Sequence, residues 1–450
     1  MRLIDALPVG KDSRIAIVGA GGKTTALFRL AREASGKNLQ SVILSATTHL
    51  AEEQCSWADQ HFTINTRKDI FALYDLQFEG VILLTGELGE DRRTRGLSSD
   101  LISEVEKLAQ NHQSALLIEA DGSRMKPLKA PADHEPAIPS WVDTVIVVAG
   151  MNGLGQELSE DNVHRPEIFG HLSGLKPGSL IQKEHLVEVL LSEGGGLKGI
   201  PDGARRIVML NQCDTPVKAA QGKQMSTRLL SAYGQVILSK LNPPSAEEVT
   251  AVHRQVAGVV LAAGGSSRLG RPKQLLEWQG KPFVQAVVET ARDSGLSPVI
   301  VVIGAYQQEV EAALEGFPVQ LVINPDWMEG QATSVRSAVS YLSDEYPQVE
   351  AALFFLVDQP QIPSALVQTL LDAYSETFSP ITAPMVDDRR GNPVLFDRST
   401  FKELSKLEGD AGGRQVFSRF KVQYIPWLDS TAGLDVDTRE DYERLLREFQ

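Results

Sequence analysis

The sequence predicts an α/β protein built from two three-layer domains. With 450 residues, the chain is longer than a single hydrophobic core usually supports. Short β-branched apolar runs alternate with amphipathic segments, a pattern typical of parallel strands buried on both faces and joined by crossover helices. Two of these runs lead into glycine-rich turns, one starting at Gly19 and the other at Ala263. Two such turns so far apart predict two separate modules.

The expected elements follow the apolar runs in chain order. Strands are expected at 14–18, 41–44, 81–84, 115–118, 144–148 and 207–210, and then at 258–261, 298–303, 319–323 and 352–357. Amphipathic spacing predicts helices at 99–110, 283–293 and 364–374. Pro243 and Pro244 interrupt regular structure, so domains are expected at 1–245 and 254–450.

Composition narrows the class of function. Hydrophobic residues make up 42% of the chain and charged residues 23%, as in ordinary globular proteins. A net charge of −14 argues against nucleic acid and anionic membranes as partners. The sequence has no signal-peptide pattern and no apolar run of the roughly 18 residues that span a membrane, so a cytoplasmic location is expected. Cys55 and Cys213 lack the spacing of metal ligands and are expected to be reduced, partly buried thiols.

The turn in the second half (residues 263–270, the second glycine turn) has the character of a polyphosphate site. Small residues let backbone amides approach phosphates closely, and Arg268 and Lys273 can neutralise a leaving pyrophosphate. A later apolar run ends in Asp358, at the strand edge where open α/β sheets bind ligands. Because Mg²⁺ prefers a few carboxylates together with phosphate oxygens, Asp358 with Asp435 or Asp437 is expected to hold it.

An alternative applies to the acidic residues near the C-terminus. Asp437 or Thr438 could instead cap the last helix, because side-chain oxygens at that position accept hydrogen bonds from free backbone amides.

Several segments of the second half match one known family in order. They lie at residues 261–274, 324–334, 358–360, 391–396, 409–414 and 435–438. Together they resemble the MocA-type molybdenum cofactor cytidylyltransferases of the MobA-like NTP transferase superfamily, over roughly residues 255–450. The resemblance implies a Rossmann-like nucleotidyltransferase domain.

The resemblance also implies roles for individual residues. Arg268, Lys273 and Asp358 would be catalytic, and Asp358, Asp435 and Asp437 would supply the ligands of Mg²⁺. The implied nucleotide-binding residues are Leu261, Ala262, Ala263, Gly264, Ser266 and Ser267. The implied acceptor-binding residues are Ser334, Gly391, Asn392, Pro393, Asp410 and Arg414, although Arg414 could equally be a solvated surface charge.

The implied reaction is Mg²⁺-dependent transfer of CMP from CTP to the phosphate of molybdenum–molybdopterin. Pyrophosphate leaves, and no protein nucleophile is needed because a phosphate monoester is already anionic near neutral pH. Within the family, Leu-Ala-Ala-Gly accompanies cytosine and Leu-Ala-Gly-Gly accompanies guanine. This chain has Ala263 at the variable position, so CTP is expected rather than GTP.

The turn in the first half (residues 19–25, the first glycine turn) follows an apolar run and opens an apolar helix, as a phosphate loop requires. Its G-x-x-G-K-T-T spacing is closer to that of Mur ligases than to the common Walker pattern, since Ile17 stands where that pattern has its first glycine. Lys23 is expected on the β/γ-phosphates and Thr24 on Mg²⁺. The alternative is a glycine-rich turn with an exposed lysine. The expected nucleotide-binding residues are Gly19, Gly21, Gly22, Lys23, Thr24 and Thr25.

Other residues of the first half could complete such a site. Glu119 and Asp121 follow an apolar run and are candidate metal ligands in a Walker-B-like position. Residues 211–214, Asn-Gln-Cys-Asp, are similar to the base-reading N-K-x-D of GTPases, with Gln212 in place of lysine. ATP and GTP are the two candidate ligands of this half, and the sequence does not choose between them. His49 and the pair His134–Glu135 are candidate polar site residues, with an ordinary loop role as the alternative.

The first half also resembles a known family over about residues 10–240. The matching segments are residues 19–25, 46–49, 85–87, 119–124, 127–131, 134–136 and 163–166. They resemble the YqeC type of selenium-dependent hydroxylase accessory protein. The resemblance implies an accessory nucleotide-binding module for the maturation of molybdenum hydroxylases, with the apo-hydroxylases as candidate partners.

Two other hypotheses stay open at this stage. The chain could be a delivery chaperone that binds nucleotide as a switch and hands over cofactor without turnover. It could also be a cytidylyl- or guanylyltransferase for another small phosphate.

Overall fold

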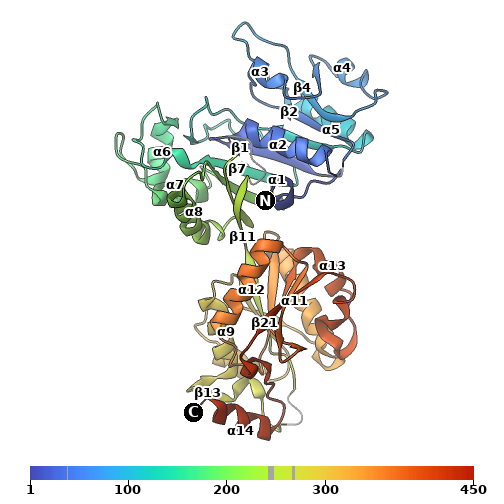
Figure 1. The fold of residues 1–450 in the computed structure, drawn as a ribbon, viewed down its shortest axis with the longest axis vertical. Coiled ribbons are helices and arrows are strands. Elements are labelled where there is room, and N and C mark those ends of the chain that lie inside the picture. The colour runs from blue at the N-terminus through green and yellow to red at the C-terminus, as the bar shows by residue number, and fades with distance from the viewer. Residues whose placement is uncertain (38, 242–247, 266–268, 450) are drawn as a thin grey trace. The chain divides into compact units, whose positions relative to one another are not determined.

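The computed structural model describes residues 1–37, 39–241, 248–265 and 269–449, apart from the side chains of residues 410–412 and 414. The chain divides into two compact units, Met1–His253 and Arg254–Gln450 (Figure 1). Each unit has its own sheet and its own core. No helix in the described ranges is long and apolar enough to cross a membrane.

The first unit is an α/β layered unit around a nine-stranded sheet in the order β11-β10-β9-β7-β1-β5-β2-β4-β3. Its elements are α1 (Leu3–Ala6), β1 (Arg14–Gly19), α2 (Lys23–Ser35), β2 (Ser41–Ala46), α3 (Glu52–Cys55), β3 (Gln60–Thr63), α4 (Arg67–Phe71), β4 (Gly80–Thr85), α5 (Ser99–Asn111), β5 (Ala115–Glu119), β6 (Leu128–Lys129), β7 (Thr144–Gly150), η1 (Met151–Gly153), β8 (Val163–His164), α6 (Pro166–Ser173), α7 (Lys183–Leu191), β9 (Arg205–Asn211), α8 (Pro216–Leu229), β10 (Gln235–Ser239) and β11 (Val249–Arg254).

Strand β1 lies at the centre of this sheet and carries the first glycine turn at its carboxyl end. It runs parallel to β5 on one side and to β7 on the other. Its side chains alternate between two buried faces. Ala16 and Val18 pack with residues of α7 and α8, and Ile15 and Ile17 are buried as well. Helix α2 contacts β1 (Figure 1). The turn is therefore held by a fully buried strand.

The second unit is built on an eight-stranded sheet in which β16-β15-β12-β17-β20-β18-β19 are neighbours and β21 pairs with β18. Its elements are β12 (Val256–Leu261), η2 (Lys273–Leu275), β13 (Glu277–Trp278), β14 (Lys281–Pro282), α9 (Phe283–Asp293), β15 (Val299–Ile303), α10 (Gln307–Ala313), β16 (Gln320–Ile323), η3 (Trp327–Glu329), α11 (Gln331–Glu345), β17 (Ala351–Leu356), α12 (Ser364–Thr377), β18 (Ile381–Val386), β19 (Arg389–Arg390), β20 (Val394–Asp397), η4 (Arg398–Thr400), α13 (Phe401–Leu404), η5 (Gly409–Val416), β21 (Val422–Trp427), η6 (Ser430–Gly433) and α14 (Arg439–Glu448).

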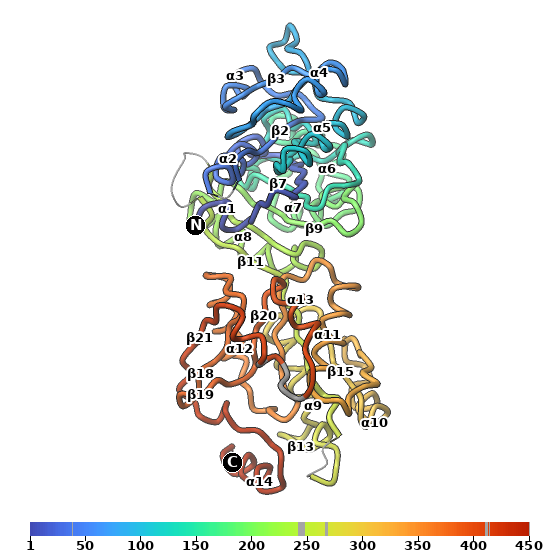
Figure 2. The backbone as a smooth tube through the Cα atoms, turned by 90° about the vertical axis from the view of Figure 1, so that its right-hand side faces the viewer, coloured from blue at the N-terminus to red at the C-terminus, as the bar shows by residue number. Residues whose placement is uncertain are grey.

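Helices cover both faces of this sheet in a Rossmann-like arrangement. Val260 of β12 belongs to the cluster formed with α9 and α12, and Val259 to the cluster formed with α11 and α13. The C-terminal helix α14 lies beside the β13–β14 hairpin, where Tyr442 Oη donates to Glu277 O at 2.8 Å (Figure 2). The acidic segment that precedes α14 is thereby brought back toward the sheet.

Each strand expected from the sequence overlaps an observed strand, and the three expected helices are α5, α9 and α12. Two features differ from expectation. The second sheet is mixed, because β17 pairs antiparallel with β20. The first sheet continues through β11, beyond residue 245.

Candidate functional site

A pocket of the second unit opens where β12 and β17 end. Its lining includes residues of the second glycine turn, of η3, and of the segments after both strands. The described residues that line it are Leu261, Ala263, Gly264, Gly265, Leu269, Lys273, Gln274, Trp327, Met328, Gly330, Gln331, Ser334, Leu356, Val357, Asp358 and Asp437. Sequence reasoning had not assigned a role to Gln274, Trp327 or Met328.

The second glycine turn is fixed by a buried amide. Gln274, fully buried, donates from Nε2 to Ala262 O at 2.8 Å and to Gly264 O at 2.7 Å. Ala262 N in turn donates to Val302 O of β15. The turn is therefore held in place by hydrogen bonds from both sides, which is how a preorganised anion site avoids reorganisation on binding.

Lys273 lies between two carboxylates at the floor of this pocket. Its Nζ is 2.7 Å from Asp358 Oδ2 and 3.1 Å from Asp437 Oδ1. Burial works against the charge, but Asp358 and Asp437 hold the pKa of Lys273 above its ordinary value. The other oxygen of Asp358, Oδ1, is buried and has no hydrogen-bond partner within residues 1–37, 39–241, 248–265 and 269–449. A buried carboxylate oxygen without a partner is costly unless a cation or donor arrives to satisfy it.

Asp435 completes a group of three neighbouring carboxylates. It accepts a hydrogen bond from Gln359 Nε2 at 2.7 Å. Burial, together with the charges of Asp358 and Asp437, raises the pKa of Asp435 to about 6. Such a group repels itself and favours a positive charge placed among its members. Among the described residues, however, no three His, Cys, Asp or Glu side chains already form a ready metal-binding cluster.

The structure distinguishes the two roles considered for the residues before α14. Thr438 is the N-cap, because its side chain accepts from Asp441 N, and Asp441 closes a capping box. The carboxylate of Asp437 instead reaches Lys273. Asp437 is thus part of the pocket and not the helix cap.

Trp327 forms one wall of the pocket against two glycines. A Cβ on Gly265 would lie 2.8 Å from the Trp327 ring, and a Cβ on Gly304 would lie 2.8 Å from Trp327 Cβ. Both glycines therefore allow an indole to approach the second glycine turn.

Of the other residues expected at this site, some line the pocket, some lie outside its lining, and some fall outside the described residues. Ser334 lines the pocket and accepts from Asn324 Nδ2 at 2.9 Å. Gly391, Asn392 and Pro393 lie between β19 and β20, outside the lining formed by the described residues. Ser266, Ser267 and Arg268 fall outside the described residues, as do the side chains of Asp410 and Arg414.

In the first unit, the first glycine turn joins β1 to α2. Gly19, Gly21 and Gly22 all have positive φ, and a Cβ on Gly19 would lie 2.1 Å from Val148 O. These positions exclude other residues on steric grounds. Such a turn leaves backbone N–H groups and the N-terminus of α2 available to an anion.

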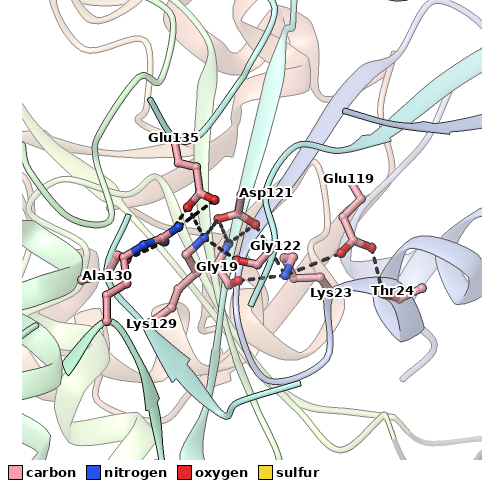
Figure 3. Close-up of polar contacts among 10 residues, drawn as sticks. Gly19, Lys23, Thr24, Glu119, Asp121, Gly122, Lys129, Ala130 and Glu135 are labelled. Atoms are coloured by element: carbon pink, nitrogen blue, oxygen red, sulfur yellow. Dashed lines mark hydrogen bonds and ion pairs between the residues drawn. The ribbon is translucent and has the colours of Figure 1, made fainter. Parts of the chain in front are cut away.

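Lys23 and Thr24 point toward the strand-end carboxylates, as Figure 3 shows. Lys23 is buried, and its Nζ lies 2.9 Å from Gly19 O and 3.5 Å from both Glu119 and Asp121. Thr24 Oγ1 donates to Glu119 Oε2 at 2.8 Å. Burial raises the pKa of Glu119 despite the Lys23 charge beside it. The alternative hypothesis, an exposed lysine on a glycine-rich turn, is therefore wrong. The Thr25 side chain forms no hydrogen bond with the described residues.

A second set of charges, centred on Lys129, supports this turn (Figure 3). Asp121 accepts from Gly19 N at 3.0 Å and from Lys129 Nζ at 2.8 Å. Lys129 also donates to Glu135 at 2.9 Å, and Arg165 contacts both oxygens of Glu135. Sequence reasoning noted Glu135 as a polar candidate but gave Lys129 and Arg165 no role. Asp121 is thus engaged by donors on several sides, which leaves Glu119 as the better-placed candidate metal ligand.

Glu135→Gln is expected to destabilise the first unit by about 3 kcal/mol near pH 7, because the buried Lys129 and the partly buried Arg165 lose their shared anion. Burial opposes the charge, but hydrogen bonds from Arg165 and Lys129 lower the pKa of Glu135 from 4.5 to about 2. A lowered folded-state pKa stabilises the protein above the unfolded value and loses that effect as pH falls toward the folded value. The difference between variant and wild type should therefore be constant above pH 5 and shrink between pH 4.5 and 2.

Native-state hydrogen exchange of peptides covering β5, compared at equal pH, measures this difference. Glu188→Gln is the matched control, since its pair with Arg228 is about half exposed on both sides and should contribute under about 1 kcal/mol. An equal loss for both variants, or one that does not shrink in acid, would contradict the prediction.

The remaining candidates of the first half lie apart from this group. His49 is exposed, with Nδ1 2.8 Å from Thr94 O. His134 is also exposed, and its side chain forms no hydrogen bond or ion pair with the described residues. Cys213 is buried and Cys55 partly buried, both as free thiols.

Comparison with known proteins gives a different family for each of the two units, Met1–His253 and Arg254–Gln450. A family model for YqeC protein matches residues 15–167, and one for the MobA-like NTP transferase domain matches residues 258–424. The uncharacterized protein YqeC of Escherichia coli (strain K12) is 34% identical over 227 residues, which cover 49% of this chain and 84% of that protein.

Relatives of the second half include an enzyme named as an oxidoreductase and one named as a nucleotidyltransferase. Nicotine blue oxidoreductase of Paenarthrobacter nicotinovorans is 37% identical over 204 residues, or 42% of this chain and 96% of that protein. A probable molybdenum cofactor guanylyltransferase of Bacillus cytotoxicus is 28% identical over 201 residues, or 43% of this chain and 97% of that protein. The chain thus belongs to the YqeC family in its first half and to the MobA-like NTP transferase family in its second.

Proposed function

We propose that the second unit transfers CMP from CTP to the phosphate of molybdenum–molybdopterin, and that the first unit is an accessory nucleotide-binding module. The observation that carries the first proposal is the meeting of the second glycine turn with Lys273, Asp358 and Asp437 in one pocket. Membership of the MobA-like NTP transferase family and similarity to a molybdenum cofactor guanylyltransferase support nucleotidyl transfer in cofactor processing.

The reaction needs charge neutralisation and positioning more than a base. An oxygen of the acceptor phosphate forms a bond to the α-phosphorus of CTP. The bond between that phosphorus and the bridging oxygen breaks, and pyrophosphate leaves with its electron pair. Lys273 and Arg268 supply positive charge for the phosphates, and the amides of the second glycine turn donate to them.

The residues of the pocket fit Mg²⁺. Asp358 Oδ1, which is buried and lacks a hydrogen bond to any described residue, and the neighbouring Asp435 and Asp437 are hard oxygen donors, which Mg²⁺ prefers. When bound, Mg²⁺ would neutralise charge on the triphosphate and polarise its phosphorus. These side chains would hold it, and Lys273 would stay protonated between two of them.

The choice of base rests on Ala263. This residue is 4% exposed and lines the pocket, so its methyl group reduces the space available to a base. We infer that the smaller pyrimidine of CTP is preferred to a purine. The indole of Trp327 offers an apolar surface on which a base can stack.

The test is release of pyrophosphate by the full chain with Mg²⁺, molybdenum cofactor and either CTP or GTP. Release with CTP well above that with GTP is expected. Faster release with GTP would overturn the base assignment, and release only with another phosphate acceptor would point to a different substrate. Binding without release would favour the delivery chaperone. Nicotine blue oxidoreductase is named for an oxidoreductase reaction, and such a reaction releases no pyrophosphate. Pyrophosphate release therefore distinguishes the proposed transfer from a reaction of that kind.

Gly264→Ala is expected to raise the KM for CTP about tenfold, or about 1.4 kcal/mol, and to leave stability unchanged. A Cβ at this position meets no atom of the described residues within 4 Å, and φ is not positive, so the variant should fold normally. The new methyl group would occupy pocket space that the triphosphate needs. Gly10→Ala, which also meets nothing within 4 Å, is the control for steady-state kinetics. An unchanged KM for Gly264→Ala would remove this turn from the nucleotide site.

For the first unit, the proposed ligand is the phosphate chain of a nucleotide. The positive-φ glycines, the buried Lys23 and the Thr24–Glu119 hydrogen bond support this proposal. Lys23 would contact the β/γ-phosphates, and Thr24 with Glu119 would lie on the side of a bound Mg²⁺. Molybdenum hydroxylases that lack cofactor are the proposed protein partners of the whole chain.

A further inference from the structure

One segment beside the first glycine turn has no role in the function proposed above. Asn211, at the end of β9, is 4% exposed, and its Nδ2 donates to Gly21 O at 2.8 Å. Its Oδ1 accepts from Ser239 Oγ and from Leu241 N, each at 3.1 Å. This one amide therefore ties the glycine turn to the ends of both β9 and β10.

Gln212 strengthens the same connection. It has a positive φ of 66°, and its Oε1 accepts from Asn152 N at 3.3 Å. Gly150 lies so close to the turn that a Cβ on Gly21 would be 2.4 Å from Gly150 Cα. Residues 211 and 212 are thus fixed against the turn from two sides, and the residues that follow them begin at a defined position beside it.

Asp214 follows in this fixed segment and presents an exposed carboxylate. Across the described ranges, no hydrogen bond or ion pair involves its side chain. It is also not needed as a cap for α8, because Thr215 is the N-cap and accepts from Lys218 N at 3.3 Å. Cys213 N, between Gln212 and Asp214, donates to Ser239 O at 2.9 Å, so the backbone is fixed up to the residue before Asp214. A carboxylate that follows so closely on residues fixed against a phosphate-type turn can meet the nucleoside end of a ligand.

The chemistry of a carboxylate selects among bases. Its two oxygens accept two parallel hydrogen bonds. Guanine offers two adjacent donors, N1–H and the exocyclic N2–H₂, in that arrangement. Adenine presents a lone pair at N1, which a carboxylate repels. We propose that the first unit takes a guanine nucleotide and that Asp214 reads its base. This inference rests on the proposed nucleotide site at the first glycine turn.

Equilibrium binding of radiolabelled GTP, ATP and XTP to the full chain with Mg²⁺ tests the proposal. Nucleotide that still binds to Lys23→Ala is assigned to the second unit. Subtracting it from the binding by wild type leaves the binding that belongs to the first unit. Asp214→Asn replaces one acceptor by a donor. It should then match xanthine, which has a carbonyl where guanine has its amino group. Asp202→Asn, an exposed acidic residue of the same unit, is the control.

The Lys23-dependent site is expected to prefer GTP over ATP by about 100-fold. Asp214→Asn should lose most of its GTP affinity and gain at least tenfold in XTP affinity, while Asp202→Asn should match wild type. Equal or tighter ATP binding at this site, or an unchanged ratio of GTP to XTP affinity in Asp214→Asn, would overturn the inference and leave the nucleotide site standing. Absence of any Lys23-dependent binding would instead overturn the nucleotide site itself, and the base assignment with it.

Discussion

Asp358→Asn is expected to lower the rate of pyrophosphate release about 1000-fold, as the loss of one preorganised electrostatic contact does in other active sites. The substitution preserves size but removes a charge that faces Lys273 at 2.7 Å. It also removes the acidic character of the buried Oδ1, which has no partner among the residues that the structure describes. Both the position of the lysine and the proposed Mg²⁺ site therefore change together. Initial rates of pyrophosphate release at saturating CTP measure the effect.

Two comparisons separate these contributions. Asp372→Asn, on the exposed side of α12, changes charge equally and should stay within about twofold of wild type. Raising the Mg²⁺ concentration should partly restore Asp358→Asn if a weakened metal site dominates, whereas Lys273→Met should not respond. Asp358→Asn with more than a third of wild-type activity at ordinary Mg²⁺ would remove this residue from the catalytic machinery.

The elements that hold both glycine turns could be predicted because their sequence pattern is local. β1 and β12 are short, β-branched runs buried on both faces, and each ends directly in small residues. Strands β18 and β21 of the second sheet were not predicted, since β18 contains Pro384 and β21 contains Pro426, residues that usually argue against a strand. β20 pairs with β17 and β21 pairs with β18, and both partners come from distant parts of the chain that no local pattern reveals.

The same division between local and distant information applies to the sites. Asp358 could be assigned from its place after an apolar run, but the choice of Asp437 over a capping role depended on Lys273, more than 150 residues away in the sequence. Lys129 was missed because it lies in a two-residue strand, β6, without any periodic pattern around it. Its importance comes from Asp121 and Glu135, which only the fold places beside it.

Lys129→Met is expected to destabilise the first unit by about 4 kcal/mol, within the range for removing one partner of a buried ion pair. The ammonium is almost fully buried and lies 2.8 Å from Asp121 and 2.9 Å from Glu135. It also donates to Gly122 O at 2.7 Å. Methionine has a similar length and fills the space, so the loss reports the charge and its hydrogen bonds. Hydrogen exchange of peptides from β1 and β5 at pH 7 measures the change.

The environment of Lys129 also determines how its loss combines with other changes. Lys107→Met, which removes an exposed lysine paired with Glu104, is the control and should cost under about 1 kcal/mol. Adding Glu135→Gln to Lys129→Met should cost less than the sum of the two single changes, because the double variant no longer leaves that carboxylate facing an absent cation. Strict additivity would show that the two residues act independently. Such independence would contradict the role of Lys129 as the shared partner that holds Asp121 against the first glycine turn.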